Sequence, residues 1–390
     1  MRSAHKPYLL ALGGMALVAL AGCGGAGDRS PGGCFADPIL PSGREVLCGI
    51  ADTAFLTEFI ALTIDPGTGA LTRLPVEVPP ILCSGGIVAV GVQFLYISLP
   101  LTEGCPPGVP EIFGFALDQT TGAPTALAGS PFSLPSDASP HGLAAVPNSH
   151  FLYVADGSRI DAFAVDSVTG VPTAIAGSPF ASGESLQLAV DPSGKFLYAS
   201  DDDPPGGVLA FTIDSGGALT SVPGSPFTIP GQTVPNSRPT GIVDTGRFVY
   251  TALTASNQIA GFSIDSGTGA LAPVAGSPFP AGSLPAVLAM ANSFLYAVNE
   301  HDGSISGYGI NSVTGVLTPL RGSPFARLSS SATLAADTSG KFLYDSTTVG
   351  IQGYSIDACT GALTAAPGSS GSIDGSLWMT VVQFPSPAAQ

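Results

Sequence analysis

Few residues of this chain are able to do chemistry, since its 390 residues include only 4 histidines and 12 lysines and arginines. One group combines suitable types: Pro140-His141, followed by Asp156 and Arg159. A histidine takes a proton from water near neutral pH, and an arginine stabilises a developing oxyanion or holds an anion. These residues therefore suit the activation of water for hydrolysis.

Two further groups extend this set. Ser237-Arg238-Pro239 supplies a second cation, and Asn299-Glu300-His301-Asp302 supplies acids and polar neighbours. The candidate catalytic residues are His141, Arg238 and Glu300, and the candidate binding residues are Asp156, Arg159, Asn299 and His301. The stretch from Phe248 to Asn257 contains no carboxylate.

A sevenfold repeat must position these residues. Its clearest mark is a glycine that closes an Asp-x-x-x-Gly turn, at steps of 46 to 53 residues. The glycines of this column are Gly69, Gly122, Gly170, Gly217, Gly269, Gly315 and Gly361. A period of about 40 to 50 residues with several short strands per unit is typical of a β-propeller.

Other columns of the repeat indicate structural roles. Six units carry Phe-Leu-Tyr or Phe-Val-Tyr, and five carry Gly-Ser-Pro-Phe. An Asp at the start of a tight turn hydrogen-bonds its own backbone, and a glycine adopts positive φ at no steric cost. The acid column from Asp65 to Asp357 is therefore predicted to be structural, neither catalytic nor metal-binding.

The chain ends predict how the repeat closes. In the fourth unit, four strand-like runs alternate with turns rich in Gly, Pro, Asp and Ser: 186–190, 195–200, 208–213 and 218–222. The first unit lacks an innermost strand, whereas Leu377 to Phe384 is a strand left over. We predict an all-β, seven-bladed β-propeller of four-stranded antiparallel blades, closed by the C-terminal strand completing blade one.

The N-terminus predicts export. Arg2 and Lys6 precede an apolar stretch from Leu9 to Leu20, which is short for a membrane span, and Leu20-Ala21-Gly22-Cys23 follows. This arrangement resembles a bacterial lipoprotein signal, whose cysteine becomes the lipidated first residue. We expect a signal peptide over residues 1–22, a lipidated Cys23 with a flexible tether over 23–40, and the propeller over 41–390. The protein would then be anchored in the cell envelope, at the periplasmic face of a membrane or at the cell surface.

Charge excludes some partners. The formal net charge is -16, and no run rich in Lys or Arg occurs. Nucleic acid and anionic lipid both require clustered basic residues, so neither is expected as a partner. Asp201-Asp202-Asp203 lacks the glycine spacing of a calcium loop and is predicted to be a solvated acidic loop. We expect no metal and no cofactor.

Five cysteines follow Cys23, in a compartment where disulfides persist. Cys83 and Cys105 lie in two connections on the same face of blade two and are predicted to pair. Cys34 and Cys48 are the next candidates, which leaves Cys359 over. No Cys-x-x-Cys motif supports a redox pair.

The repeated strings also carry a family resemblance. Asp-x-x-Thr-Gly-x-Leu-Thr, Gly-Ser-Pro-Phe and Asp-Pro-Ser-Gly-Lys-Phe-Leu-Tyr resemble those of lactonase-type seven-bladed propellers, the 6-phosphogluconolactonase-like family. The resemblance covers nearly all of the mature chain and involves mainly turn and core positions. It implies a functional mouth formed by the loops that enter each innermost strand and the loops between second and third strands. It also matches Pro140-His141 and the later Asp156 to the family's active site, and Arg238 to an arginine, with Pro239 in place of a histidine.

Two functions follow from these features. The first is a lipid-anchored binding or scaffold protein whose mouth takes a small molecule, a glycan or an envelope protein; the incomplete set of reactive residues favours it. The alternative is a lactone hydrolase acting on a sugar or related lactone, with His141 as base and the arginines as anion clamps. A fold alone does not decide between them.

Overall fold

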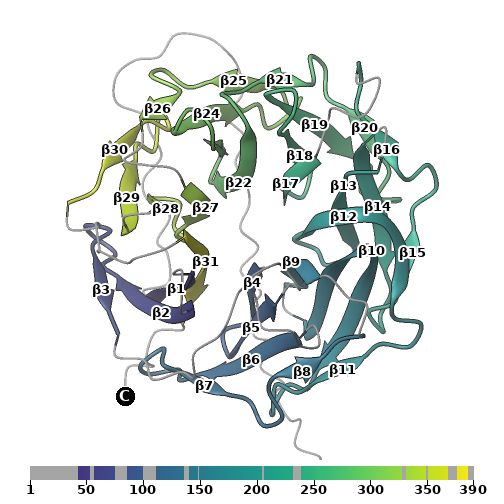
Figure 1. The fold of residues 1–390 in the computed structure, drawn as a ribbon. Helices are drawn as coiled ribbons and strands as arrows, with labels where there is room; N and C mark the ends of the chain where they lie inside the picture. Colours follow the sequence, from purple (N-terminus) through teal and green to yellow (C-terminus); the bar gives the residue numbers. More distant parts are fainter. Residues whose placement is uncertain are drawn as a thin grey trace, which may run out of the picture. The chain divides into compact units, whose positions relative to one another are not determined.

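The computed structural model describes residues 43–52, 57–74, 86–99, 111–135, 140–147, 149–203, 206–231, 239–326, 331–347, 350–367 and 376–384. The chain divides into two units, residues 1–33 and 34–390, and every described residue belongs to the second. No helix capable of crossing a membrane occurs in the described part of the chain. Seven antiparallel blades follow one another around a central axis, as the sequence predicted (Figure 1).

Each blade is a meander that runs from an innermost to an outermost strand. Blade one contains β31 (Ser376–Gln383), β1 (Glu45–Asp52), β2 (Thr57–Ile64) and β3 (Leu71–Arg73). Blade two contains β4 (Gly86–Val90), β5 (Phe94–Leu99), β6 (Glu111–Leu117), β7 (Pro124–Ala126) and β8 (Phe132–Ser133). Blade three contains β9 (Pro140–Ala145), β10 (Phe151–Val165) and β11 (Pro172–Ala174). Blade four contains β12 (Phe180–Val190), β13 (Phe196–Asp201), β14 (Gly207–Ile213), β15 (Leu219–Ser221) and β16 (Phe227–Thr228).

The last three blades repeat the pattern. Blade five contains β17 (Pro239–Asp244), β18 (Phe248–Leu253), β19 (Gln258–Ile264), β20 (Leu271–Pro273) and β21 (Phe279–Pro280). Blade six contains β22 (Pro285–Ala291), β23 (Phe294–Asn299), β24 (Ser304–Ile310), β25 (Leu317–Pro319) and β26 (Phe325–Ala326). Blade seven contains β27 (Ser331–Ala336), β28 (Phe342–Thr347), β29 (Gly350–Ile356) and β30 (Leu363–Ala365).

The C-terminal strand closes the ring. β31 pairs antiparallel with β1 over its whole length, from Glu45↔Gln383 to Asp52↔Ser376. This pairing confirms the prediction that the last strand completes blade one. The pairing covers the inner edge of β1, which would otherwise be exposed, and makes β31 the innermost strand of the blade.

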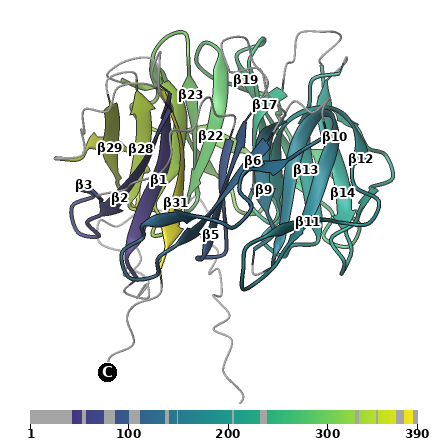
Figure 2. The same ribbon diagram turned by 60° about the horizontal axis from the view of Figure 1, so that its bottom comes forward.

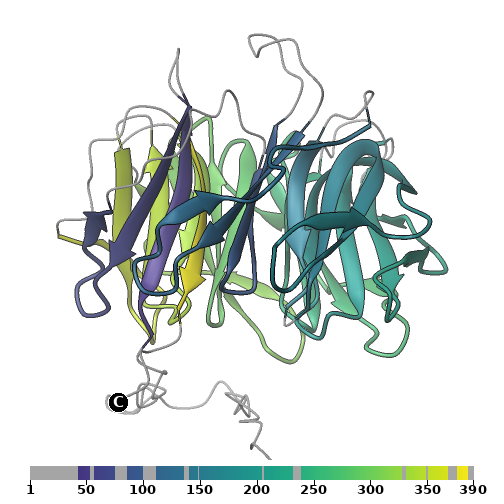
Figure 3. The same cartoon turned by 90° about the horizontal axis from the view of Figure 1, so that it is seen from below.

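The blades have two ends, which define two faces of the propeller (Figure 3). We call the end where each second strand stops and each third strand starts the mouth face. We call the opposite end, with the Asp-x-x-x-Gly turns, the turn face. At the turn face Asp65 Oδ1 accepts hydrogen bonds from the backbone N–H and the hydroxyl of Thr68, both at 2.7 Å. These bonds lower the pKa of the exposed Asp65 carboxyl, and the same pattern at Asp118, Asp166, Asp265 and Asp357 supports the structural role predicted for this column.

Adjacent blades are joined by the Phe-Leu-Tyr strands. The phenylalanine packs on the turn glycine of the next blade: a Cβ added at Gly269 would lie 2.5 Å from the Phe196 ring, and Gly269 has φ +76°. The tyrosine hydroxyl donates to the carbonyl of the same glycine, as from Tyr198 to Gly269 at 3.2 Å. Six such bonds link consecutive blades; their donors are Tyr96, Tyr153, Tyr198, Tyr250, Tyr296 and Tyr344. Glycine is therefore required at these turns for both conformation and packing.

Blade one departs from this rule. Val46 pairs with Thr63 as Phe94 pairs with Ala116, which places Cys48 where the other blades have tyrosine. Cys48 is a buried free thiol whose pKa burial raises to about 12. The pairing suggested between Cys48 and Cys34 is therefore wrong.

The remaining cysteines are only partly described. Cys359, predicted to be left over, is disulfide-bonded, and its partner lies outside the described residues. Cys83 and Cys105 also lie outside the described residues, so their pairing stays a prediction. The same holds for Cys23 and its lipid.

Candidate functional site

Blades three and four share one eight-stranded sheet, which no other pair of described blades does. β10 continues as strand through the tip of its hairpin, and β12 runs without a break from the outside of blade three to the inside of blade four. The two strands pair near the mouth face, with Arg159 opposite Ala181 and Ile160 opposite Phe180 (Figure 2). Continuous strand therefore stands here where the other described blades have turns or loops, although its ladders with β9 and β12 shift register between Val154 and Arg159.

This hairpin carries two of the predicted residues. Arg159 Nε donates to Asp156 Oδ2 at 2.7 Å. The Asp156 side chain is 1% exposed and that of Arg159 is 23% exposed. The carboxylate thus fixes the guanidinium inside the sheet, while part of the arginine still reaches solvent. Gly157, between them, has φ +56°, which turns the hairpin tip.

His141 lies in the same blade. The buried Asp156 pairs with Pro140 of β9, and His141 is the next residue of that strand. The His141 side chain is half-buried, and its carbonyl oxygen accepts a hydrogen bond from Ser98 Oγ of blade two at 2.9 Å. The structure therefore gathers His141, Asp156 and Arg159 at the mouth end of one blade.

The sequence reading missed a third charged residue here. Asp161 is 3% exposed, two residues beyond Arg159 on the third strand of blade three. Its column in the repeat is otherwise apolar or neutral: Ile60, Phe113, Leu209, Ala260, Ser306 and Gln352. An acid in a core column was the signal that could have identified it.

The blade-six candidates are not brought to this cluster, because they lie three blades away. Asn299 is fully buried, and its Nδ2 donates to Ser304 Oγ at 2.8 Å and Ser306 Oγ at 2.9 Å. Its amide thus holds the hairpin together. Glu300 and His301 are exposed in the turn that follows, and their backbone N–H groups donate to Leu284 and Ser283 carbonyls.

Blade five lacks the corresponding groups. Pro239 pairs with Leu253 as Pro140 pairs with Asp156. Thr240 therefore stands where blade three has His141, and Leu253 stands where it has the carboxylate. Arg238, which precedes this strand, lies outside the described residues.

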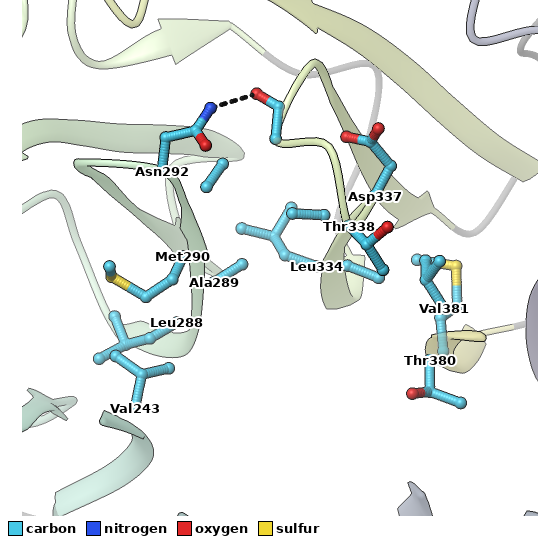
Figure 4. A pocket seen from close by; sticks show the side chains of 15 residues that line it. Val243, Leu288, Ala289, Met290, Asn292, Leu334, Asp337, Thr338, Thr380 and Val381 are labelled. Carbon is cyan, nitrogen blue, oxygen red and sulfur yellow. Dashed lines mark hydrogen bonds between the residues drawn. The ribbon is translucent and has the colours of Figure 1, made fainter. Parts of the chain in front are cut away.

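A cavity of about 480 Å³ lies elsewhere, between the innermost strands of blades five, six, seven and one. Its walls are Val243, Leu288, Met290, Leu334 and Val381 together with neighbouring alanines and polar residues (Figure 4). Asn292 closes one side by donating from Nδ2 to the Gly340 carbonyl at 3.1 Å. These residues are at the turn-face ends of their strands, so the cavity and the predicted mouth residues occupy opposite ends of the propeller.

The cavity offers little reactive chemistry. Asp337 is the one ionisable residue of its lining, and its Oδ1 accepts the Phe342 N–H at 2.7 Å. Next to the lining residue Val243, the Asp244 carboxyl has a pKa raised to about 7, chiefly by burial and less by the nearby Asp191, against a hydrogen bond from the Gly246 N–H that lowers it. No cluster of three or more metal-binding side chains occurs among the described residues.

Comparison with known proteins points to one class. Residues 226–327 and 249–366 match the family described as Lactonase, 7-bladed beta-propeller. This match and the fold make the chain similar to the seven-bladed β-propellers of the lactonase type. None of the curated proteins matches the sequence significantly.

Solved structures have the same fold. The periplasmic gluconolactonase PpgL of Pseudomonas aeruginosa superimposes with a TM-score of 0.68 at 17% identity, covering 88% of this chain and 100% of that one. A candidate 6-phosphogluconolactonase from Bacteroides uniformis gives a TM-score of 0.67 at 17% identity, covering 86% and 99%. A protein from Lactobacillus plantarum gives 0.66 at 15% identity, covering 86% and 99%. At these identities the likeness concerns the fold.

Proposed function

We propose that the protein hydrolyses a lactone at the mouth end of blade three. The observation that carries this proposal is the placement of His141, Asp156 and Arg159 at the mouth end of blade three, whose hairpin is continuous strand, unlike those of the other described blades. Binding sites built on strands hold their groups more firmly than sites on loops. The family match and the two gluconolactonase-type structures support the same reaction class.

The residues divide the reaction as follows. His141 takes a proton from water, which attacks the acyl carbon of the lactone. Arg159, oriented by Asp156, stabilises the oxyanion that forms on the carbonyl oxygen. The bond from the acyl carbon to the ring oxygen then breaks, and the proton from His141 passes to that oxygen. The product is an open-chain hydroxy acid.

The test is ring opening of a panel of sugar and aryl lactones by the purified chain. Substitutions His141→Ala and Arg159→Gln should each lower kcat/KM by about 10²-fold or more, the scale of a positioned base or an oxyanion partner. The matched controls are His150→Ala and Arg247→Gln, which remove the same residue types from exposed positions of the turn face. Equal loss in the controls, or no turnover by the unaltered chain, would reject the proposal.

A binding role is the second candidate, and one observation favours it. Blade five has Thr240 and Leu253 at the positions where blade three has its histidine and carboxylate, so the mouth is not lined by reactive groups on both sides. A protein that binds a lactone or glycan without turning it over would show saturable calorimetric heats and no ring opening. His141→Ala would then lower affinity alone.

We also propose that the chain is exported and anchored by a lipid on Cys23. The signal-like N-terminus supports this, and one similar structure is of a periplasmic protein. Mass spectrometry of the mature N-terminus tests it. An acylated Cys23 is expected, and an unmodified Met1 would exclude it.

A further inference from the structure

The described part of the mouth face is strongly acidic. At the ends of the second strands and the starts of the third, the acids include Glu111, Asp156, Asp161, Asp201, Asp202, Asp203, Glu300 and Asp302. Arg159 is the one lysine or arginine at the described residues of these strand ends. Among the described residues, acids therefore outnumber basic groups at these strand ends.

Blade six provides an internal reference for the charged cluster. Counted from Tyr153 and Tyr296 of the second strands, Asp156 and Asn299 correspond. Counted from Phe163 and Tyr308 of the third strands, Arg159 corresponds to Ser304 and Asp161 to Ser306. In blade six these three positions hold uncharged side chains, with bonds of 2.8 and 2.9 Å from Asn299 Nδ2 to the two serines. The Ser304 hydroxyl also donates to the Asp302 carboxylate at 2.5 Å, so the charge of this network stands on the turn and not at the three positions.

Blade six therefore forms the mouth ends of its second and third strands without charge at these positions, although a turn joins its strands where β10 is continuous. Blade five fills them with Leu253, Gln258 and Ala260, which are also uncharged. Burying the Asp156 and Asp161 carboxylates in a blade with one guanidinium costs desolvation energy that a neutral or apolar set avoids. Since blades five and six form without charge at these positions, we attribute the net negative charge of blade three to the molecule that binds at the mouth.

Blade four brings a further buried acid close to blade three. Asp201 is 3% exposed and ends the second strand of that blade. The crossing strand β12 passes directly over it, since a Cβ added at Gly183 would lie 2.3 Å from Asp201 Oδ1. The backbone N–H of Asp203 donates to the same oxygen at 3.2 Å. β12 thus lies between two buried acids, Asp156 on one side and Asp201 on the other.

We propose that this acidic mouth selects uncharged lactones and excludes phosphorylated ones, an inference that rests on the proposed function. A phosphate monoester carries about −1.5 to −2 charges at pH 7 and would enter against acids within a Debye length of about 10 Å. An uncharged lactone meets no such barrier. Ring opening then creates a carboxylic acid that ionises, so the product carries a charge that the same acids repel. Selection of the substrate and release of the product thus share one cause.

The experiment compares two substrates that differ only in charge. The full chain is assayed with glucono-1,5-lactone and with its 6-phosphate at ionic strengths of about 0.02 and 0.5 M. We expect kcat/KM to favour the uncharged lactone by about 10²-fold or more at low salt, and salt to raise the rate only for the phosphorylated one.

Charge variants locate the effect. Asp202→Asn with Asp203→Asn removes two mouth acids outside the proposed catalytic set and should raise kcat/KM for the phosphorylated lactone several-fold at low salt. The matched control is Asp166→Asn with Asp265→Asn, which changes net charge equally at the turn face. Asn311 caps the same turn in blade six, so asparagine is compatible with this position. The control should leave both rates unchanged.

The outcomes separate the two proposals. If the phosphorylated lactone is preferred, or the control pair acts like the mouth pair, the selection is overturned while the hydrolase stands. If neither lactone is opened and His141→Ala changes nothing, the proposed function fails and the selection fails with it.

Discussion

At the residue scale, two aspartates show how burial and hydrogen bonding set the pKa of a carboxyl. Asp265 lies on a turn of the turn face and Asp244 ends strand β17 at the same face, yet the pKa values of their carboxyls shift in opposite directions. Hydrogen bonds from Thr268 lower the pKa of the exposed Asp265 carboxyl, whereas burial raises the pKa of the Asp244 carboxyl to about 7. Since the pKa of Asp244 is raised from 3.8, the folded state favours the neutral form of this carboxyl over the charged form.

This shift predicts a pH dependence of stability. The pKa of this carboxyl is higher in the folded than in the unfolded chain, so the folded state binds the proton more tightly. The resulting stabilisation is present at low pH and is lost as pH rises through about 7. The free energy of unfolding should therefore fall between pH 5 and pH 8, by up to about 3 kcal/mol. Asp244→Asn should abolish most of this fall. Urea titrations of both proteins at the two pH values provide the measurement, and identical slopes against pH would contradict the assignment.

The turn glycines predict a second residue-scale effect. Gly217 has φ +83°, and an added Cβ would lie 2.8 Å from the Phe151 ring. Gly217→Ala should destabilise the protein by about 2 to 4 kcal/mol, from backbone strain and lost packing together. Gly91→Ala is the control, because Gly91 has φ +59° but nothing within 4 Å of the added atom. Its melting temperature should fall clearly less; equal falls would show that packing against phenylalanine is unimportant.

At the scale of elements, the sequence predicts where strands begin better than how they are joined. In blade four the expected runs 195–200 and 208–213 correspond closely to β13 and β14. The run 186–190 is only the end of β12, which starts at Phe180. Apolar alternation and turn residues mark the strands. The pairing of β12 with β10 depends on a contact between two blades, which no local pattern encodes.

The candidate site divides in the same way. His141, Asp156 and Arg159 were predictable because they break the repeat with reactive side chains. Asp161 was missed because its neighbours alternate like a core strand, and the cavity was missed because its walls are ordinary strand residues such as Leu288 and Leu334. The sequence predicted Asn299 as a residue that binds a ligand. In the structure its side-chain amide donates hydrogen bonds to the hydroxyls of Ser304 and Ser306.

Ring closure gives the prediction at this scale. β31 supplies Met379 and Val382 to the cores shared by blade one with blades seven and two. Deleting residues 376–390 removes this strand and exposes the inner edge of β1. We expect no cooperative thermal transition from the shortened chain, because an edge and two apolar faces are left uncovered. A transition at the temperature of the full chain would show that closure is dispensable.

At the scale of the whole molecule, the propeller separates two kinds of site. Reactive and acidic residues gather at the mouth face, held by the shared sheet of blades three and four. The cavity lies at the turn-face ends of the innermost strands, lined mainly by aliphatic side chains. We propose that lactone hydrolysis takes place at the mouth face and not at the cavity. This division follows from the repeat, whose turns are fixed by hydrogen bonds while its mouth positions vary from blade to blade.

The measurement that tests this claim most directly compares a variant at each end. The rate of glucono-1,5-lactone opening is determined for the unaltered chain, for His141→Ala at the mouth, and for Thr380→Phe, which partly fills the cavity. The account predicts a loss of about 10²-fold or more for the mouth variant and an unchanged rate for the cavity variant. The contrary result is activity that survives His141→Ala and is lost with Thr380→Phe, while both variants melt at the temperature of the unaltered chain. It would place the active site at the cavity and not at the mouth face.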